Sequence, residues 1–272
     1  MTTTTSPEAN GTVLSLSGVS KRFGAVQALK DIELDVRAGE VVALVGDNGA
    51  GKSTLVKTIA GVYGPDEGHM HFDGKAVNVT SPAEAQHLGI ATVFQDLALC
   101  DNLDVVANLF LGRELKHGRA LDEVEMERQS WQLLRQLSAK IPSVRIPVAS
   151  LSGGQRQTVA IARSLLGEPK VVMLDEPTAA LGVAQTAEVL NLVERLREHG
   201  LGVILISHNM ADVMAVADRV AVLRLGRNNG VFQVSQTSSQ DIIAAITGAT
   251  SNPVSQRAAR RTPQENTPQE NS

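Results

Sequence analysis

One loop of this sequence has the residue types and spacing that hold phosphates. Residues 46–53 read Gly-Asp-Asn-Gly-Ala-Gly-Lys-Ser, which fits the phosphate-loop pattern, and Thr54 follows. The glycines let the backbone wrap closely around phosphates, so that amide N–H groups and a helix N-terminus point at negative charge. Lys52 can reach the β- and γ-phosphates of a nucleotide, and the Ser53 hydroxyl can bind Mg²⁺. We therefore predict a nucleoside-triphosphate site formed by Gly46, Asp47, Asn48, Gly49, Ala50, Gly51, Lys52, Ser53 and Thr54.

Two carboxylates follow a second apolar run. Residues 171–174 read Val-Val-Met-Leu, and Asp175 and Glu176 come next. At the end of a buried strand, Asp175 is placed to hold Mg²⁺, directly or through water. Glu176 can polarise the water that attacks a γ-phosphate. Two adjacent acids alone would also fit the start of a solvated loop, but the phosphate loop upstream favours the catalytic interpretation.

A third motif presents backbone N–H groups at the start of a helix. Residues 151–155 read Leu-Ser-Gly-Gly-Gln and lead into the helical run 156–166. Ser152 and the two glycines offer a hydroxyl and bare amides at a helix N-terminus, which is a second anion site. A capped helix start explains the serine but not the pair of glycines. The sequence therefore predicts two separate places that bind negative charge.

These motifs follow predicted strands or begin predicted helices, and those elements position them. Four short apolar runs rich in Val, Ile and Leu have the pattern of buried parallel strands. Between two of them, residues 185–199 place apolar side chains at helical spacing, and residues 53–60 have helical character after the phosphate loop. Strand–helix–strand repetition predicts a parallel sheet covered by helices. The four runs are residues 41–45, 171–174, 203–206 and 220–225.

Two regions depart from that alternation. Residues 13–36 and 68–80 alternate polar and apolar side chains, with Asp73-Gly74 where a hairpin turn would form, and they predict an antiparallel sheet. Residues 98–165 are mainly helical in pattern. The predicted fold class is α/β: a P-loop NTPase with a RecA-like parallel sheet core, an antiparallel β flank and an inserted helical subdomain.

Composition argues against several other classes. The 272 residues carry a formal net charge of −4 and only 3% aromatics, which argues against nucleic-acid binding by a basic face or base stacking. The single cysteine suits a reducing compartment, and no apolar run approaches the roughly 20 residues of a membrane helix. The first residues lack the pattern of a signal peptide. We expect a domain over 13–247 between disordered tails at 1–12 and 248–272.

Together, the three motifs make the sequence resemble the nucleotide-binding subunits of ATP-binding cassette (ABC) transporters, over residues 13–247. In that family two cassettes pair head to tail, and each ATP lies between one phosphate loop and the partner's Leu-Ser-Gly-Gly-Gln motif. The resemblance implies that a set of residues contacts ATP in trans, namely Ser152, Gly153, Gly154 and Gln155. It also implies Mg²⁺ as cofactor, held by Ser53, Gln95 and Asp175.

Three residues acquire roles through the resemblance alone. Gln95 matches the glutamine that senses Mg²⁺ and the γ-phosphate and links to the membrane partner. His208 matches the switch histidine that contacts the γ-phosphate, so the implied catalytic residues are Glu176, His208 and Gln95. Phe23 matches the aromatic that stacks on adenine, although a Phe there could equally be a core residue. The apolar segment after Gln95 suggests that residues 95–108 dock the permease, although helical core explains most of it.

The resemblance extends to the monosaccharide-importer branch of the family. Gly182 stands where the general family pattern has Asp, so communication between two ATP sites is left open, and residues 96–103 and 207–210 also look like that branch. The implied function is an ATPase that drives uptake of a ribose-, xylose- or fructose-type sugar from the cytoplasmic side of a bacterial plasma membrane. The implied partners are a membrane permease, an extracytoplasmic sugar-binding protein and a second cassette. A homodimer is expected, with a heterodimer open, and no nucleic acid is expected. The alternatives are a cassette for a different solute and a non-transport cassette ATPase.

Overall fold

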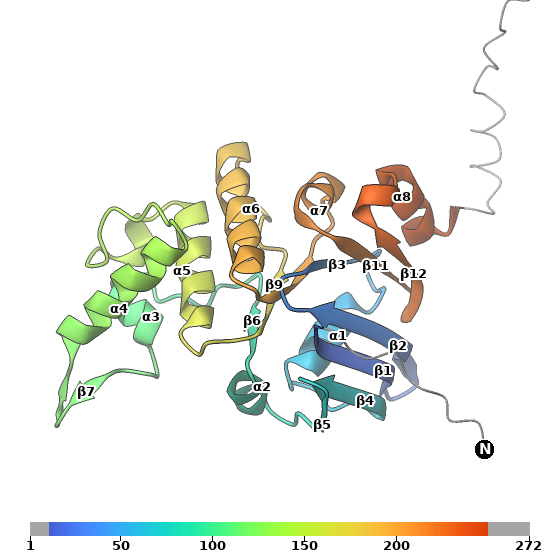
Figure 1. Ribbon diagram of the computed structural model, residues 1–272, viewed down its shortest axis with the longest axis horizontal. Coiled ribbons are helices and arrows are strands. Elements are labelled where there is room, and N and C mark those ends of the chain that lie inside the picture. Colours follow the sequence, from blue (N-terminus) through green and yellow to red (C-terminus); the bar gives the residue numbers. More distant parts are fainter. Residues whose placement is uncertain (1–10, 250–272) are drawn as a thin grey trace, which may run out of the picture.

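The computed structural model describes residues 11–249, and its centre is a six-stranded sheet (Figure 1). The strand order is β12-β11-β3-β10-β9-β6, so strands distant in the sequence are neighbours. All neighbouring pairs are parallel except β11 and β12, which confirms the predicted parallel core. The strands are β3 (Val41–Val45), β6 (Ile90–Val93), β9 (Val171–Asp175), β10 (Gly202–Ile206), β11 (Arg219–Arg224) and β12 (Arg227–Gln233).

Both faces of this sheet are covered. The odd-numbered residues of β3 belong to one buried apolar cluster and the even-numbered residues to another, as the alternation of side chains along a strand requires. Two buried faces explain why the parallel strands are continuous apolar runs. The strand predicted over 220–225 ends one residue earlier, because Leu225 has a φ of 49° and turns the chain toward β12.

A second, antiparallel sheet forms the predicted flank, with the order β2-β1-β4-β5. The turn Asp73-Gly74 joins β4 to β5, as expected. Thr12 pairs with Arg37, so it belongs to β1 and not to the tail expected over 1–12. Residues 1–10 of that tail, and most of the one expected over 248–272, lie outside the described residues. The strands are β1 (Thr12–Phe23), β2 (Val26–Arg37), β4 (Glu67–Phe72) and β5 (Lys75–Val77).

Helices cover the sheet and fix the ends of its strands. Leu55 and Ile59 of α1 (Lys52–Ile59) share a core with residues of both sheets, so α1 lies between them. The other face of the parallel sheet carries three helices, which contribute buried residues to the second core. These are α6 (Val183–Glu198), α7 (Met210–Val216) and α8 (Ser239–Thr247), with the 3₁₀ turn η2 (Val234–Gln236) before α8; the short α2 (Pro82–Leu88) precedes β6.

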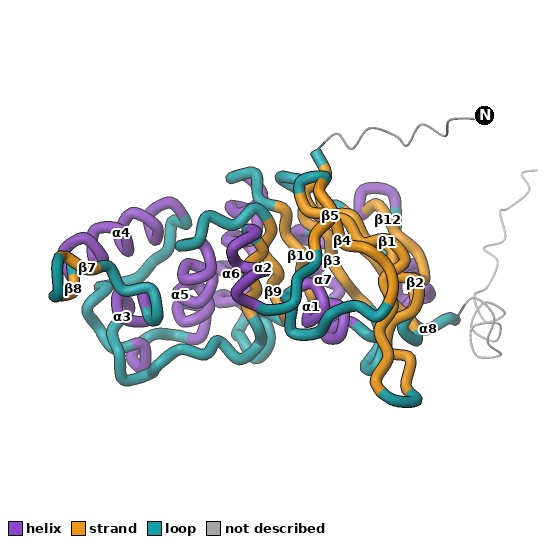
Figure 2. Tube along the Cα trace, turned by 90° about the horizontal axis from the view of Figure 1, so that it is seen from below, coloured by secondary structure: helices purple, strands orange, loops and turns teal. Residues whose placement is uncertain are grey.

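The predicted helical subdomain lies at one end of the molecule, opposite the antiparallel sheet (Figure 2). Its helices are α3 (Val105–Phe110), α4 (Glu123–Gln136) and α5 (Gly153–Leu165), with the 3₁₀ turn η1 (Val148–Ser150). Leu134 of α4 and Leu137 at the C-terminal end of that helix are buried in the core of the subdomain. The subdomain also holds a short hairpin that the helical pattern did not predict, β7 (Lys116–His117) with β8 (Ala120–Leu121). Among residues 11–249, every helix is too short or too polar to span a membrane.

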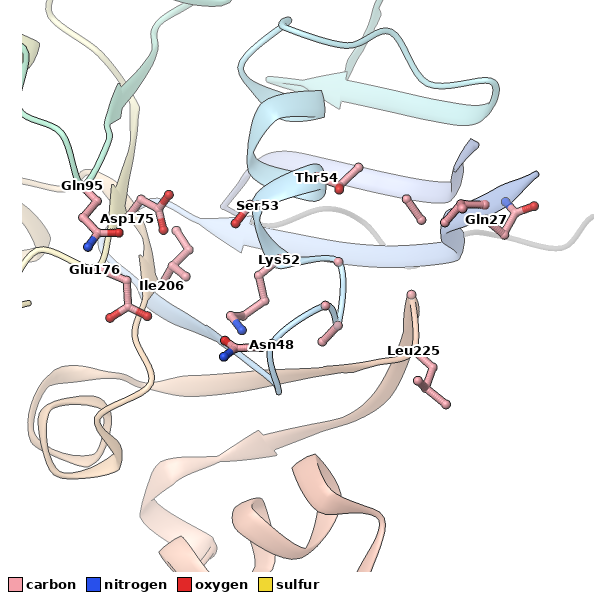
Figure 3. Close-up of a pocket in the computed structure, with 16 residues that line it drawn as sticks. Gln27, Asn48, Lys52, Ser53, Thr54, Gln95, Asp175, Glu176, Ile206 and Leu225 are labelled. Atoms are coloured by element: carbon pink, nitrogen blue, oxygen red, sulfur yellow. The ribbon is translucent and has the colours of Figure 1, made fainter. Parts of the chain in front are cut away.

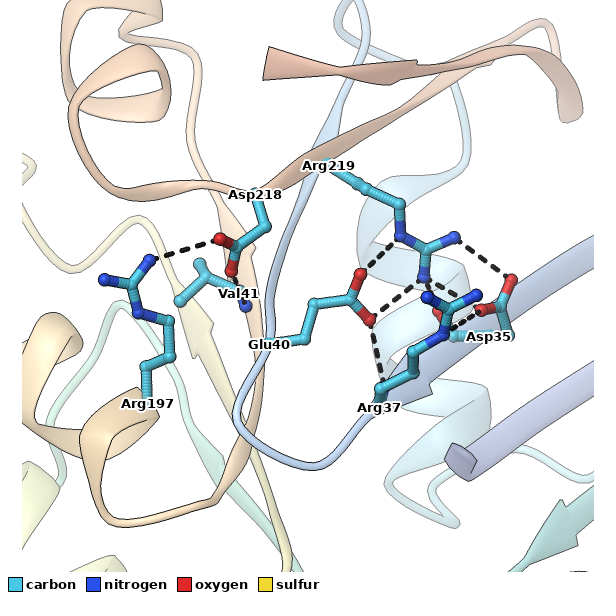
Figure 4. Close-up of polar contacts among 7 residues, drawn as sticks. All are labelled: Asp35, Arg37, Glu40, Val41, Arg197, Asp218 and Arg219. Atoms are coloured by element: carbon cyan, nitrogen blue, oxygen red, sulfur yellow. Dashed lines mark hydrogen bonds and ion pairs between the residues drawn. The ribbon is translucent and has the colours of Figure 1, made fainter. Parts of the chain in front are cut away.

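A buried ion cluster ties the antiparallel sheet to the parallel one (Figure 4). Nε of Arg219, at the start of β11, donates to Glu40 Oε1 at 2.5 Å, and Nη2 donates to Asp35 Oδ2 at 2.9 Å. The Arg219 and Glu40 side chains are only 10% and 11% exposed. Arg219 has a raised pKa because these hydrogen bonds outweigh its burial. The cluster joins β2 of the antiparallel sheet to the beginnings of β3 and β11.

Candidate nucleotide-binding site

The carboxyl ends of the parallel strands surround an open cleft of about 530 Å³. The phosphate loop after β3, the acids at the end of β9 and Gln95 after β6 all line it. Figure 3 shows Gln95, Asp175 and Glu176 at one end of the cleft and Gln27 and Leu225 at the other, with Lys52 and Ser53 between them. Crevices at this edge of open α/β sheets are where such folds bind ligands.

The phosphate loop needs its glycines for conformation and for space. Gly46 and Gly51 have φ values of 153° and 106°. A Cβ on Gly46 would lie 2.3 Å from the Leu223 carbonyl oxygen, and one on Gly51 would lie 2.9 Å from the Ala28 carbonyl oxygen. Gly51 precedes α1 and provides no side-chain cap, so the first amides of α1 keep their capacity to bind an anion.

Lys52 bridges the loop. Its Nζ donates to the carbonyl oxygens of Gly46 at 2.5 Å and Asp47 at 3.1 Å. Burial lowers the pKa of Lys52, and the nearby charges of Glu176, Asp47 and Asp175 oppose that shift. The ammonium is thus held inside the loop, beside the place where phosphates would lie.

Asp175 ends β9 as a partly buried carboxylate. Its pKa is raised, first by burial and then by the charge of Glu176, while Lys52 and Lys57 oppose the shift. The cleft concentrates negative charge at this end, which a bound cation would neutralise. Oxygen atoms of Ser53, Gln95 and Asp175 line this end, and such hard donors are the kind that Mg²⁺ prefers. In the described part of the chain, no three His, Cys, Asp or Glu side chains gather closely enough to hold a metal without other ligands.

Glu176 and His208 are in direct contact. Nδ1 of His208 lies 2.7 Å from Glu176 Oε2. Glu176 has a φ of 50° and donates its backbone N–H to the Ile206 carbonyl oxygen at 2.9 Å. β9 and β10 are neighbours in the sheet, so the loops that follow them meet. Two of the three residues that the resemblance makes catalytic, Glu176 and His208, are therefore in contact.

The Leu-Ser-Gly-Gly-Gln motif lies elsewhere. Ser152 caps α5, with its hydroxyl accepting from Gln155 N at 3.3 Å and Gln155 Oε1 accepting from Ser152 N at 2.9 Å. The glycines allow close packing, since a Cβ on Gly153 would lie 2.8 Å from a methyl of Leu181. None of the residues 152–155 lines the cleft of its own chain.

Phe23, the expected adenine-stacking residue, does not line the cleft either. Its ring packs edge-on against Tyr63, with ring centroids 5.0 Å apart, and Lys21 Nζ lies 5.7 Å from its centroid. The apolar side chains at this end of the cleft are Val26 and Leu225, which are 64% and 78% exposed. Sequence reasoning missed both, because neither belongs to a motif.

The β11–β12 turn also contacts the phosphate loop directly. Gly226 donates its backbone N–H to the Ala50 carbonyl oxygen at 3.0 Å and accepts from Lys30 N at 2.7 Å. A Cβ on Gly226 would lie 2.7 Å from the Ala28 carbonyl oxygen. The glycine after the fourth apolar run was the available signal for this close approach.

Fold and site together define a P-loop nucleoside triphosphatase, with a phosphate loop after one strand and acids at the end of another strand of the same sheet. The family model of the ABC transporter matches residues 29–179, and the chain belongs to that family.

Several known proteins are similar to the chain. It is 44% identical over 235 residues to the xylose/arabinose import ATP-binding protein XylG of Sulfolobus acidocaldarius, covering 86% of this chain and 94% of that one. It is 44% identical over 245 residues to the fructose import ATP-binding protein FrcA of Rhizobium meliloti, covering 87% and 94%. A Burkholderia lata protein, provisionally named a ribose/galactose/methyl galactoside import ATP-binding protein, is 42% identical over 238 residues, and the match covers 87% of this chain but 46% of that longer one.

Solved structures agree with this assignment. An ATP-binding cassette of an ABC transporter in its ADP conformation has a TM-score of 0.75 and 26% identity, covering 92% of this chain and 99% of that one. A dimeric cassette in a post-hydrolysis state, bound to ADP and Pi, has a TM-score of 0.68 and 27% identity, covering 81% and 98%. The chain is accordingly an ABC-type ATPase.

Proposed function

We propose that this ATPase drives uptake of a monosaccharide through a separate membrane permease. The observation that carries the proposal is one cleft that unites Lys52, Glu176 and Gln95, in a chain whose relatives are named for sugar import. The phosphates of ATP would lie on the phosphate loop, where Lys52 and the first amides of α1 converge. An extracytoplasmic sugar-binding protein would deliver the solute, and the cassette would work on the cytoplasmic face of the membrane.

The proposed hydrolysis uses Glu176 as general base. Its carboxylate would take a proton from the water that attacks the γ-phosphate, while His208 would hold a γ-phosphate oxygen. In the structure the two side chains bond to each other, so this bond must open before both can act. ATP supplies the alternative partner for His208.

Mg²⁺ is the proposed cofactor, and the donors present fit it. The Ser53 hydroxyl, the Gln95 amide oxygen and the Asp175 carboxylate would hold it together with phosphate oxygens and water. When bound, it neutralises charge on the β- and γ-phosphates. Gln95 follows β6 and leads into the helical subdomain, which makes it suited to report the state of the cleft to that subdomain.

A second cassette completes the proposed site. Four residues of the Leu-Ser-Gly-Gly-Gln motif lie outside the cleft of their own chain, so they would not contact the phosphates of an ATP bound there. These are Ser152, Gly153, Gly154 and Gln155. We propose that they contact ATP held by the phosphate loop of a second copy, in a head-to-tail homodimer. The dimeric cassette among the similar structures supports this arrangement. Gly182 faces open space with an extended φ of −73° and ψ of 164°, so its contact with a second copy would involve backbone only.

The permease would dock in a groove between the sheet and the helical subdomain. The groove has a volume of about 260 Å³ and includes Phe94 and Leu111, which are 36% and 45% exposed. Arg113 and Arg163 line it too, and Arg163 donates to the carbonyl oxygens of Leu97 and Ala98. Apolar surface with two cations fits a short amphipathic segment that carries a carboxylate. The groove shares residues 96–98 with the predicted docking segment, 95–108, and its other lining residues lie outside that segment.

Uptake measurements test the proposal. A strain that lacks only this coding sequence receives either the wild-type chain or Glu176→Gln. We expect the wild type, and not the variant, to restore uptake of radiolabelled xylose, fructose or ribose. Restored uptake of a different solute class, or restored export, would contradict the sugar assignment while leaving the ATPase assignment in place.

A further inference from the structure

One buried carboxylate has no role in the proposed hydrolysis. Asp212 lies in the first turn of α7 and is 5% exposed. Its Oδ2 accepts from the Thr178 hydroxyl at 2.6 Å, and its Oδ1 accepts from Asn209 Nδ2 at 3.0 Å. A buried charge is stable only when such donors satisfy it, so Asp212 fixes the two groups that it contacts.

Those two groups belong to the two catalytic loops. Thr178 stands two residues after Glu176, on the loop between β9 and α6. Asn209 directly follows His208, on the loop between β10 and α7. The Asp212 carboxylate is therefore a bridge between the loop of the general base and the loop of the switch histidine.

The local geometry allows the Asp212 carboxylate to fix the position of the loop that carries His208. The His208 side chain is 74% exposed, so little packing holds it in place. Its loop is held instead by polar contacts: Asn209 N donates to the buried Ser207 Oγ at 3.0 Å, and Asn209 Oδ1 caps α7 by accepting from Ala211 N at 3.0 Å. The side-chain oxygen of Asn209 thus accepts a hydrogen bond from the helix, and its side-chain nitrogen donates one to Asp212.

The loop of Thr178 continues into the segment that would face a second cassette. Ala180, at a φ of 60°, and Gly182 are exposed, and Val183 is 91% exposed. A displacement of this segment would act on Thr178, and through the Asp212 carboxylate on the loop of His208. This route needs no charged side chain at position 182.

We propose that Asp212 is a positioning residue that couples the Thr178 loop to His208 and so sets the distance between His208 and Glu176. The inference rests on the proposed roles of Glu176 and His208 in hydrolysis. It supplies a path by which a second cassette can influence the histidine of the first, although Gly182 lacks the family's carboxylate.

Steady-state ATPase measurements on two near-isosteric variants test the coupling. Asp212→Asn retains one acceptor atom but loses the second, and Thr178→Val removes the hydroxyl donor. We expect kcat to fall roughly ten- to a hundredfold in each, the scale of a misplaced catalytic group, with KM for ATP unchanged within about twofold. Thr178→Ser, which keeps the hydroxyl, should restore kcat. Thr247→Val, which removes a hydroxyl bonded to Ile243 within α8, is the matched control and should leave kcat unchanged.

The same substitutions in a His208→Ala background separate positioning from a structural role. If Asp212 acts through His208, adding Asp212→Asn or Thr178→Val to His208→Ala will cause little further loss, because the position of the histidine no longer matters. Full additivity would overturn the proposal, as would a rise in KM or a fall in melting temperature that accounts for the loss of kcat. Glu176→Gln in the same assay reports the proposed mechanism separately. Lost turnover there, together with a normal Asp212→Asn variant, would refute this inference alone.

Discussion

Replacing Arg219 by Met should destabilise the fold without altering the nucleotide site. Arg219 is the common partner of Glu40 and Asp35, and its removal leaves the 11%-exposed Glu40 carboxylate without its guanidinium. Breaking a buried pair from one side costs about 3–5 kcal/mol. Because the Asp35 side chain is 44% exposed and can regain water, we expect a loss of stability at the lower end of that range, about 3 kcal/mol.

Thermal unfolding is the assay. For a domain of this size, a loss of about 3 kcal/mol corresponds to a fall in Tm of roughly 6–12 °C. The double variant Arg219→Met/Glu40→Gln should recover more than half of that fall, because it removes the buried charge but keeps an acceptor for the Arg37 N–H, which bonds to Glu40 at 3.0 Å. The cluster lies at the start of β3, whereas the phosphate loop follows the opposite end of that strand. KM for ATP should therefore not change in the folded variants. A single variant that unfolds within 2 °C of wild type, or a double variant no more stable than the single one, would show that the buried ion cluster does not stabilise the fold in this way.

Three other substitutions probe the cleft. Gly51→Ala should lower stability by about 1–3 kcal/mol in urea unfolding and weaken ATP binding, since its Cβ would meet the Ala28 carbonyl oxygen at a φ of 106°. We expect the adenine to lie against the apolar end of the cleft that Leu225 lines, so Leu225→Ala should raise KM for ATP roughly three- to tenfold while inhibition by tripolyphosphate stays unchanged. A larger rise in Phe23→Ala would contradict this. Asp175→Asn should abolish turnover yet raise Tm at neutral pH. The folded-state pKa of Asp175 is raised, so its ionised form costs stability above the ordinary value of 3.8, and the difference in Tm should shrink as the pH falls through that region.

The buried strands of the parallel sheet could be predicted, because a strand covered on both faces is a continuous run of apolar residues. Residues 41–45 and 171–174 are apolar throughout because both faces of the sheet are covered, and such runs cannot be mistaken for solvated segments. Ile90–Val93 was missed because it is short and only Gly89 marks its start. The β7–β8 hairpin has two residues per strand, which is too few for any alternation to register.

The site was predictable in its motifs and not in its contacts. Spacing alone identified the phosphate loop and the acids, because a fixed local chemistry requires adjacent residues. The bond between His208 and Glu176 depends on β9 and β10 being neighbours, and strand order is a property of the whole sheet. The same holds for Asp212 and Thr178, which are 34 residues apart. The contact between Phe23 and Tyr63, from a distant segment, could not be predicted from spacing either, and stacking of Phe23 on adenine stays a prediction.

Glu176 is the proposed general base of ATP hydrolysis in this cleft. The most direct test compares single-turnover ATP hydrolysis and ATP binding by the purified wild-type chain and by Glu176→Gln, with Mg²⁺ present. Removal of a general base typically costs about 10²–10⁴-fold in rate, so we expect Glu176→Gln to lose activity on that scale while its ATP affinity is retained. Hydrolysis by Glu176→Gln within a few fold of the wild-type rate would contradict that role.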